Sequence, residues 1–590
     1  MANPDHPNTL YAQLYTHLSK LYPDEAAELT DILMAKLDEF PLHADPASRP
    51  ASRWDESDVV LITYGDSIIS NDEPPLRTLK SFLKTHMEGV FPIVHILPFF
   101  PYSSDDGFSV IDFMKVNPDL GDWEDIRALS EDSDLMMDLV INHVSRESLW
   151  FADYIADKEP GNGYFIELPK DTDVSMVTRP RSSPLLVPVN THRGVKYLWA
   201  TFSDDQIDLN FANPKVLLAF VDIYLSYIQW GARIVRLDAI AFLWKTLGTR
   251  CVHLPQTHEV VKLLRTLMDA VANNGIVLTE TNVPNDENRS YFGNCDEAHM
   301  IYQFGLPPLL LHCFFKGTSQ HLSQWASELD HMPAGCTGLN FSASHDGVGL
   351  RSLEGVLPDF EIEDLVDGMH RFGGFVSLKS NSDGSTSPYE INISYFDAMQ
   401  GTRRGPDQWQ IPRFVCSQAI MMALKGVPAL YIHSMLATPN HLEGVERTGR
   451  TRSINRRKWN LGDIEQLLEQ PNTPNAEVLK SLKALITLRK SCPAFHPNAA
   501  QEVVDIDYSI FSLLRTATHI PATELGGEAP QKILAIHNIS AYNQKITLKN
   551  RPELSDHTRW RDLISGKELE GILANNELAP YQVMWLEAIH

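Results

Sequence analysis

The sequence has few cysteines, no long apolar run and a shortage of basic residues, and each absence excludes a class of protein. The six cysteines are scattered, without a CxxC pair or histidines at zinc spacing, so we expect neither a disulfide scaffold nor structural zinc. No run of about eighteen apolar residues and no leader-like first segment occurs, which predicts no membrane span and a cytoplasmic protein. Fifty Lys and Arg against 76 Asp and Glu give a net charge of −26, which argues against nucleic-acid and membrane partners.

The rest of the composition is that of a globular protein with a repeating strand–helix pattern. Of 590 residues, 43% are hydrophobic and 21% are charged, which is enough apolar material for a sizeable core. Nearly all-apolar strands that alternate with helices are typical of a parallel sheet covered by helices, here an α/β (β/α)₈ TIM barrel. The strands are predicted at 58–64, 93–98, 135–142, 231–242, 275–280, 300–304, 337–343 and 428–432, and the helices at 76–87, 123–129, 214–230, 258–272 and 476–491.

Polar stretches rich in proline and glycine interrupt the alternation and divide the chain. The stretch 145–213 is too long for a connecting loop, so we predict an inserted B subdomain there and a second, smaller insertion at 348–410. Alternating segments at 508–515, 533–539, 544–549 and 581–586 predict a C-terminal antiparallel β domain. The full division is a helical extension 1–53, barrel parts 54–144, 214–347 and 411–504, the two insertions, and the β domain 505–590.

Four of the predicted strands end in polar side chains that would be costly to bury without a purpose. Arg236 and Asp238 stand two positions apart, so both point to one face of their strand. Singly, each group has an ordinary structural explanation as a buried ion pair or a helix cap. Together they favour an active site, because barrel enzymes build theirs at the C-terminal strand ends. The groups are Asp138 with Asn142 and His143, Arg236 with Asp238, Glu280 within 279–282, and His345 with Asp346.

Two carboxylates on different strands suit glycoside chemistry with retention of configuration. Asp238 can form a glycosyl ester, while Glu280 protonates the leaving oxygen and then deprotonates the incoming acceptor. Arg236 is expected to keep Asp238 ionised at neutral pH. His143, His345 and Asp346 suit hydrogen bonds to sugar hydroxyls. Phe108 and its aromatic neighbours near Asp105 provide either an apolar wall for a sugar ring or plain core packing.

Several short motifs resemble the α-amylase superfamily of retaining α-glucoside enzymes. The four that carry this resemblance are LVINH at 139–143, VRLDA at 235–239, TE at 279–280 and SHD at 344–346. Within the superfamily the chain is most similar to the sucrose phosphorylase subfamily of glycoside hydrolase family 13. That finer resemblance is carried by PFFPYSSDDGFSVID at 98–112, FGLPPLLLH at 304–312, GVPALY at 426–431 and SINR at 453–456.

The resemblance implies a role for each matching residue. Asp238 resembles the family's nucleophile, Glu280 its acid/base, and Asp346 its transition-state-stabilising carboxylate. The glucose-binding shell would consist of Asp105, Phe108, His143, Arg236, His345 and Arg452. The family also implies no cofactor and no metal, and nothing in the sequence resembles an oxygen-ligand cage for calcium.

The implied enzyme is a hexosyltransferase of the disaccharide phosphorylase type that works by double displacement. It would transfer glucose from sucrose to Asp238 and then, reversibly, to inorganic phosphate, giving α-glucose 1-phosphate or glucosylating other acceptors. Arg181, in the RPR sequence at 179–181, resembles the family's phosphate contact, and Tyr389 and Glu390 lie in its acceptor loop. The partners expected are therefore an α-glucoside and phosphate, and the sequence is compatible with a monomer or a homodimer.

The chain departs from the sucrose phosphorylase pattern near the acceptor. Glu390 stands where Gln is common and Phe242 where several have Tyr, and TNVP at 281–284 also differs. Similar differences occur in relatives that act on glucosylglycerate, glucosylglycerol or sucrose 6′-phosphate, so those donors are alternatives to sucrose. An anionic acceptor would need extra cations at the mouth. The candidates for these cations are Arg181, Arg289, Arg403 and Arg404.

Two readings outside the phosphorylases also fit parts of the pattern. A hydrolase or transglucosidase would use the same barrel but would not depend on phosphate. A catalytically inactive barrel would serve as a sugar-binding or partner-binding subunit, although such a module has no need to keep Asp238, Glu280 and Asp346 together. Phosphate-dependent release of glucose 1-phosphate would distinguish a phosphorylase from a hydrolase or transglucosidase. Loss of turnover in an Asp238→Asn variant would distinguish an active enzyme from an inactive barrel.

Overall fold

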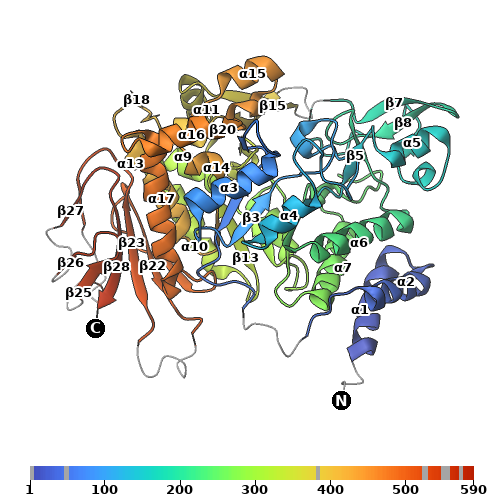
Figure 1. The fold of residues 1–590 in the computed structure, drawn as a ribbon, viewed down its shortest axis with the longest axis horizontal. Coiled ribbons are helices and arrows are strands. Elements are labelled where there is room, and N and C mark those ends of the chain that lie inside the picture. The colour runs from blue at the N-terminus through green and yellow to red at the C-terminus, as the bar shows by residue number, and fades with distance from the viewer. Residues whose placement is uncertain are drawn as a thin grey trace.

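Eight parallel strands close into a barrel at the centre of the molecule, which confirms the predicted fold class (Figure 1). The structure is a computed structural model that describes residues 6–45, 52–181, 183–380, 386–520, 529–546, 554, 559–569 and 576–589. Neighbours in the barrel follow the order of the chain, and β19 closes it by pairing with β1, Leu430 opposite Leu61. The strands are β1 (Val60–Thr63), β3 (Ile93–Ile96), β4 (Asp134–Leu139), β10 (Ala232–Leu237), β11 (Ile276–Thr279), β12 (Met300–Tyr302), β13 (Thr337–Phe341) and β19 (Val427–Tyr431).

Helices surround the barrel because each has one apolar side and a defined start. Asp122 forms a capping box with Asp125 at the start of α4, and Asn213 caps α6 just before a proline at the first helical position. Apolar side chains of these helices bury against strands that are themselves buried on both faces. The main helices are α3 (Pro75–Met87), α4 (Trp123–Ser130), α6 (Pro214–Gln229), α7 (Pro255–Val271), α9 (Leu306–Lys316), α10 (Gln320–Glu328), α13 (Gln410–Ala423) and α17 (Pro474–Lys490).

Two excursions leave the barrel at the C-terminal ends of its strands. The first, between β4 and β10, holds α5 (Leu149–Ala156), the pair β5 (His143–Ser145) and β9 (Gln206–Asp208), and a three-stranded sheet. That sheet consists of β6 (Glu167–Leu168), β7 (Leu186–Thr191) and β8 (Gly194–Trp199), at the upper right of Figure 1. The second, after β13, contains α11 (Asp359–Arg371) and a sheet of β14 (Val348–Gly349), β15 (Phe375–Ser380) and β16 (Thr386–Asn392).

The chain after β19 first returns across the top of the barrel and then forms a separate sheet. The short elements are α14 (Ile432–Met435), α15 (Leu442–Thr448), which lies at the upper edge in Figure 1, and the 3₁₀ turn η8 (Thr451–Asn455). The antiparallel sheet at the C-terminus confirms the predicted β architecture there. Its strands run in the order β21 (Ala500–Val503), β22 (Ile510–Thr516), β23 (Lys532–Asn538), β28 (Val583–Ile589), β25 (Arg559–Asp562) and β26 (Glu568–Leu569).

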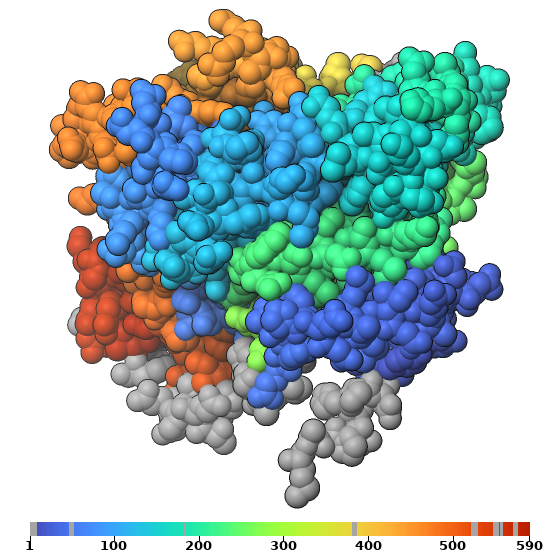
Figure 2. Space-filling model, turned by 45° about the vertical axis from the view of Figure 1, so that its right-hand side comes forward, coloured from blue at the N-terminus to red at the C-terminus, as the bar shows by residue number. Residues whose placement is uncertain are grey.

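The first two helices, α1 (His6–Leu21) and α2 (Ala26–Glu39), lie on the outside of the barrel. Figure 2 shows them in blue against green segments of the chain. His17 Nδ1 lies 2.6 Å from Glu259 Oε1 on α7, and the Tyr22 hydroxyl donates to the Phe211 carbonyl at 2.6 Å. These contacts fasten the extension to the barrel. The seven-part division of the chain stays a prediction, and residues 547–549 of the strand predicted at 544–549 lie outside the described residues.

Across the ranges that the structure describes, no helix combines the length and the apolar character needed to cross a lipid bilayer.

Candidate active site

One pocket at the C-terminal end of the barrel gathers nearly all the residues that the sequence pointed to. Asp238 follows β10, Glu280 follows β11, and His345 and Asp346 follow β13. The excursions contribute from above: Arg181 comes from the first, and Tyr389 and Glu390 come from β16 of the second. The lining consists of Asp105, Phe108, His143, Arg181, Phe202, Gln206, Asp238, Ala239, Glu280, Asn282, Phe304, His345, Asp346, Gly347, Tyr389, Glu390 and Arg452. Arg236 is not in that lining and reaches the site through Asp238.

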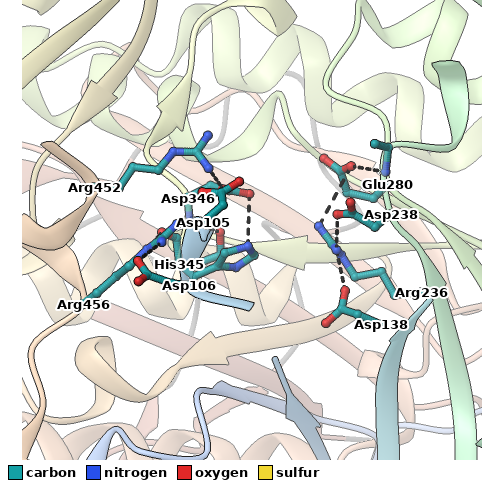
Figure 3. Close-up of polar contacts among 12 residues, drawn as sticks. Asp105, Asp106, Asp138, Arg236, Asp238, Glu280, His345, Asp346, Arg452 and Arg456 are labelled. Atoms are coloured by element: carbon teal, nitrogen blue, oxygen red, sulfur yellow. Dashed lines mark hydrogen bonds and ion pairs between the residues drawn. The ribbon is translucent and has the colours of Figure 1, made fainter. Parts of the chain in front are cut away.

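A buried ionic chain runs under Asp238 (Figure 3). Arg236, whose side chain is 2% exposed, donates from Nη1 to Asp238 Oδ1 at 2.7 Å and also binds Asp138. Asp138 Oδ2 lies 2.7 Å from His95 Nε2 on the neighbouring strand β3. Burial alone would raise the pKa of Asp138, but Arg236 and His95 lower it to about 2. The chain therefore fixes Arg236 in place, and Arg236 in turn holds the Asp238 carboxylate.

Glu280 and Asp238 both lie near the Arg236 guanidinium, but the other groups around them differ. Burial raises the pKa of Glu280 to about 7, helped by the nearby carboxylates of Asp238 and Asp346. Arg236 and the Ala239 N–H, which donates to Glu280 Oε2 at 3.0 Å, oppose that rise. A carboxyl group with a pKa near neutrality can both donate and accept a proton, as an acid/base catalyst must. Burial also raises the pKa of Asp238, and Arg236 is the main group acting against it.

On the opposite wall, Asp346 is held by cations rather than by other acids. Arg452 Nη1 lies 2.6 Å from Asp346 Oδ1. The same guanidinium binds Glu390 through two hydrogen bonds, Nε to Oε1 at 3.0 Å and Nη2 to Oε2 at 2.6 Å. Burial would raise the pKa of Asp346, but Arg452 and then His345 hold it well below its usual range. Asp346 is therefore ionised at neutral pH, and the charge of Arg452 is shared between two carboxylates.

The remaining lining supplies polar atoms and one aromatic stack for a ring with hydroxyl groups. The rings of Phe108 and His345 are parallel within 5° with centroids 4.7 Å apart. His143 Nε2 lies 2.9 Å from the Phe108 carbonyl and 3.2 Å from Gln206 Nε2, which also donates to Asp105 Oδ2 at 3.3 Å. Asp105 has a φ of 53°, a strained value for a residue with a side chain, and such strain is concentrated at functional sites. Sequence reasoning missed Gln206, since nothing in the sequence near it suggests a site.

Of the arginines suggested for an anionic acceptor, only Arg181 reaches the pocket. Its guanidinium carbon lies 5.9 Å from the centre of the Tyr389 ring. The other three candidates do not line the pocket: Arg289 ends helix α8 (Asn285–Arg289), and Arg403 and Arg404 form the turn between β17 (Gly401–Thr402) and β18 (Gly405–Pro406). Their partners are the His331 carbonyl, Asp364 and the Tyr542 hydroxyl respectively.

A buried lysine joins the site to the first excursion. The Lys245 side chain is 5% exposed, and its Nζ lies 2.7 Å from Asp208 Oδ2 on β9 and 2.8 Å from Asn142 Oδ1, next to His143. Asp208 also accepts from the Thr201 N–H and hydroxyl. Because the carboxylate has no exposure to water, the ammonium group is the charge that offsets it.

We therefore expect Lys245→Met to lower the free energy of unfolding by about 3 kcal/mol, because it leaves the charge of Asp208 buried without a cation. Urea denaturation measures this loss. Lys36→Met is the control, since Lys36 pairs with Asp222 at the surface and such pairs contribute less than about 1 kcal/mol. In the double variant with Asp208→Asn, part of the stability should return. A loss no larger than that of the control would show that Lys245 does not offset Asp208.

One group outside the pocket has the composition of a metal site. The ligand atoms of Glu56, His496 and His519 lie within 4.8 Å of one another. The Asn498 N–H donates to His496 Nδ1 at 2.9 Å, however, so that nitrogen's lone pair is already used. None of the three lines the pocket.

Comparison with known proteins agrees with this geometry. Residues 89–346 match the family model described as the α-amylase catalytic domain. A glucosylglycerate phosphorylase of Escherichia coli (strain K12) is 44% identical over 543 residues, which cover 91% of this chain and 93% of that protein. The chain belongs to the α-amylase family. The predicted family and enzyme class, a hexosyltransferase of the disaccharide phosphorylase type, are confirmed.

Two further comparisons show lower similarity. A sucrose phosphorylase of Bifidobacterium adolescentis is 28% identical over 463 residues, covering 74% of this chain and 86% of that protein. The crystal structure of sucrose 6F-phosphate phosphorylase from Thermoanaerobacter thermosaccharolyticum superposes with a TM-score of 0.71 at 24% identity, over 84% of this chain and 96% of that one. Sucrose as the first choice of donor is thus less well supported than the alternative, glucosylglycerate.

Proposed function

We propose that this protein is a glucosylglycerate phosphorylase, which transfers glucose from an α-glucoside of glycerate to inorganic phosphate. The observation that carries the proposal is the 44% identity with the E. coli glucosylglycerate phosphorylase along almost its whole length, against 28% for the sucrose phosphorylase. The pocket supports the proposal, because its lining combines Arg181, which forms no ion pair with any described residue, with the carboxylates of Asp238 and Glu280.

In the first half of the reaction, Asp238 attacks the anomeric carbon of the bound glucoside. Glu280 donates its proton to the glycosidic oxygen, so that glycerate leaves and a glucosyl ester of Asp238 forms. Arg236 holds Asp238 in position at 2.7 Å. The ionised Asp346 carries negative charge on the opposite wall, where it stabilises the positive charge that develops on the sugar ring.

In the second half, phosphate takes the place that glycerate has left. Glu280, now ionised, accepts a proton from the incoming phosphate, whose oxygen attacks the anomeric carbon and displaces Asp238. Two inversions at one carbon give net retention, so the product is α-glucose 1-phosphate. The reverse reaction uses the same groups in the opposite order, which makes the transfer reversible.

The two anions, glycerate and phosphate, depend on the same cation. Two arginines line the described pocket, Arg181 and Arg452. Arg452 is bound by Asp346 and by both oxygens of Glu390, which is 2% exposed. Its charge is therefore already balanced. The Arg181 guanidinium lies over the face of the Tyr389 ring and forms no ion pair with a described carboxylate. It can therefore bind the carboxylate of glycerate in one half-reaction and phosphate in the other.

The test compares donors that differ by a charge. We expect glucosylglycerate to give phosphate-dependent glucose 1-phosphate with a kcat/KM about 10²-fold above that of glucosylglycerol, which lacks the carboxylate. In Arg181→Gln that preference should largely disappear and the KM for phosphate should rise, whereas Arg404→Gln, an exposed arginine outside the pocket, should behave like the wild type. Sucrose and sucrose 6′-phosphate complete the panel. A kcat/KM for sucrose above that for glucosylglycerate would overturn the donor assignment. Glucose release without phosphate would show that the enzyme is a hydrolase and not a phosphorylase.

A further inference from the structure

A second pocket opens at the same end of the barrel and shares no lining residue with the first. Its volume of about 400 Å³ lies within the range of about 300–1,000 Å³ usual for small-molecule sites. It is formed by the segments that follow β1, β3 and β19. The lining includes Tyr64, Asp66, Tyr102, Asp106, Asn117, Asp119, His433, His441, Gly444, Arg447, Thr448, Arg456, Arg457 and Lys458. The mechanism above uses none of these side chains.

One side of this second pocket gathers positive groups that have no carboxylate partner. Arg447 and Arg457 make no ion pair with any described residue, although the chain as a whole has a net charge of −26. The Arg457 guanidinium instead lies 3.8 Å from the centre of the Trp459 ring. Burial lowers the pKa of His433 and of His441, and Arg457 lowers both further. Both histidines are therefore neutral at neutral pH and offer ring nitrogens for hydrogen bonds, while the unpaired charges of Arg447 and Arg457 line an open space that an anion can occupy.

The other side of the second pocket carries groups that bind hydroxyls. Asp66 is paired with Lys458 and Asp106 with Arg456, and Asn117 and Asp119 stand near them in the lining. Ion-paired carboxylates and an amide keep oxygens available as hydrogen-bond acceptors. Tyr64 and Tyr102 provide aromatic surface of the kind that sugar rings pack against. A phosphate alone has no use for these groups, whereas a sugar phosphate uses both sides.

The ion pair between Arg456 and Asp106 lines the second pocket and lies beside His345 and Asp105 of the first (Figure 3). Arg456 Nε donates to the His345 carbonyl at 2.8 Å, and Asp106 directly follows Asp105 of the first pocket. Arg456 Nη2 is buried without a hydrogen-bond partner among the described side chains and backbone groups. The two pockets are therefore neighbours with a wall in common, each with its own set of side chains.

We propose that the second pocket is a binding site for a sugar phosphate. The phosphate lies between Arg447, Arg457 and the two histidines, His433 and His441, and the sugar hydroxyls face the acidic side. Arg447 on α15 precedes Arg452 of η8 and Arg457 follows it, so the ligand is bound by the stretch of chain that also holds Asp346 through Arg452. The proposal rests on the second pocket alone and does not depend on which glucoside the enzyme cleaves.

The test is isothermal titration calorimetry of the full chain with glucose 6-phosphate. We expect binding that weakens at least tenfold in Arg457→Gln and in Arg447→Gln, and that is unchanged in the exposed control Arg404→Gln. Two variants are used because Arg457 packs on Trp459, whereas Arg447 is exposed and its loss cannot disturb packing. For the part of the binding that is lost in Arg457→Gln, inorganic phosphate should bind at least tenfold more weakly than glucose 6-phosphate, and glucose alone should make no contribution.

The other outcomes overturn the proposal. Binding of glucose 6-phosphate that is equal in the wild type and in both arginine variants would place the ligand elsewhere, for example in the first pocket. Equal affinity for phosphate and for glucose 6-phosphate would reduce the second pocket to a site for a simple anion. Because the measurement needs no turnover, failure of the proposed donor specificity leaves its result unaffected.

Discussion

Replacing Asp238 by Asn is expected to reduce glucose 1-phosphate formation by about 10⁴-fold or more, as loss of a catalytic nucleophile does in enzymes that form a covalent intermediate. The amide cannot form the glucosyl ester, and it also leaves Arg236 with one buried carboxylate, Asp138, in place of two. Initial rates with glucosylglycerate and phosphate measure the loss. Mass spectrometry of enzyme quenched during turnover should find a glucosyl adduct on the wild type and none on the variant.

A surface carboxylate provides the matched control for this experiment. Asp222 pairs with Lys36 at the surface and lies outside both pockets, so Asp222→Asn makes the same chemical change without an effect on turnover. Circular dichroism should show that both variants keep the barrel. Activity of the Asp238 variant within tenfold of the wild type would rule out Asp238 as the nucleophile.

Replacing Glu280 by Gln should produce a loss that depends on the leaving group. With glucosylglycerate, kcat/KM should fall by about 10²–10⁴-fold, the usual contribution of a general acid. With α-glucosyl fluoride, whose leaving group needs no proton, formation of the glucosyl enzyme should stay close to the wild-type rate. Single-turnover measurements with both donors separate these cases.

The pH dependence gives a second measure of the same group. In the free wild-type enzyme Glu280 has a pKa of about 7 and must be protonated to assist departure of glycerate. The kcat/KM for glucosylglycerate should therefore fall as pH rises through about 7, and on the acid side it should fall again where the nucleophile Asp238 takes up a proton. In Glu280→Gln the fall on the alkaline side should be missing. An equal loss with both donors, or an unchanged pH profile, would contradict the assignment.

The barrel could be predicted from the sequence because its strands are short apolar runs with charged ends. The run predicted at 58–64 forms β1 (Val60–Thr63), and the one at 428–432 forms β19 (Val427–Tyr431). Helix α9 (Leu306–Lys316) escaped prediction, because nearly every residue in it is buried and it has no polar face to give a helical period. The hairpin of β15 and β16 was likewise concealed within a polar insertion.

The carboxylates of the site could be predicted, but their neighbours could not. Strand ends place Asp238 and Glu280 side by side as soon as a parallel barrel is assumed. The pairing of Arg452 with Glu390 joins η8 to β16, 62 residues apart, and such contacts depend on the path that the intervening chain takes. Asp105 and Asp106 both have positive φ values, a backbone conformation that could not be predicted from their residue types. The second pocket escaped prediction for the same reason.

The pairing of β1 with β19 sets the order in which the molecule can be completed during synthesis. Leu61 emerges from the ribosome long before its partner Leu430, so the first strand must wait with one edge unpaired while the other six barrel strands are made. The half-built sheet can already hold Asp238 and Glu280, whereas Arg452 arrives only after the last strand. Contacts so distant along the chain are slow to form, and an open strand edge invites aggregation. A nascent chain stalled before Tyr431 therefore has neither a closed barrel nor the arginine that holds Asp346.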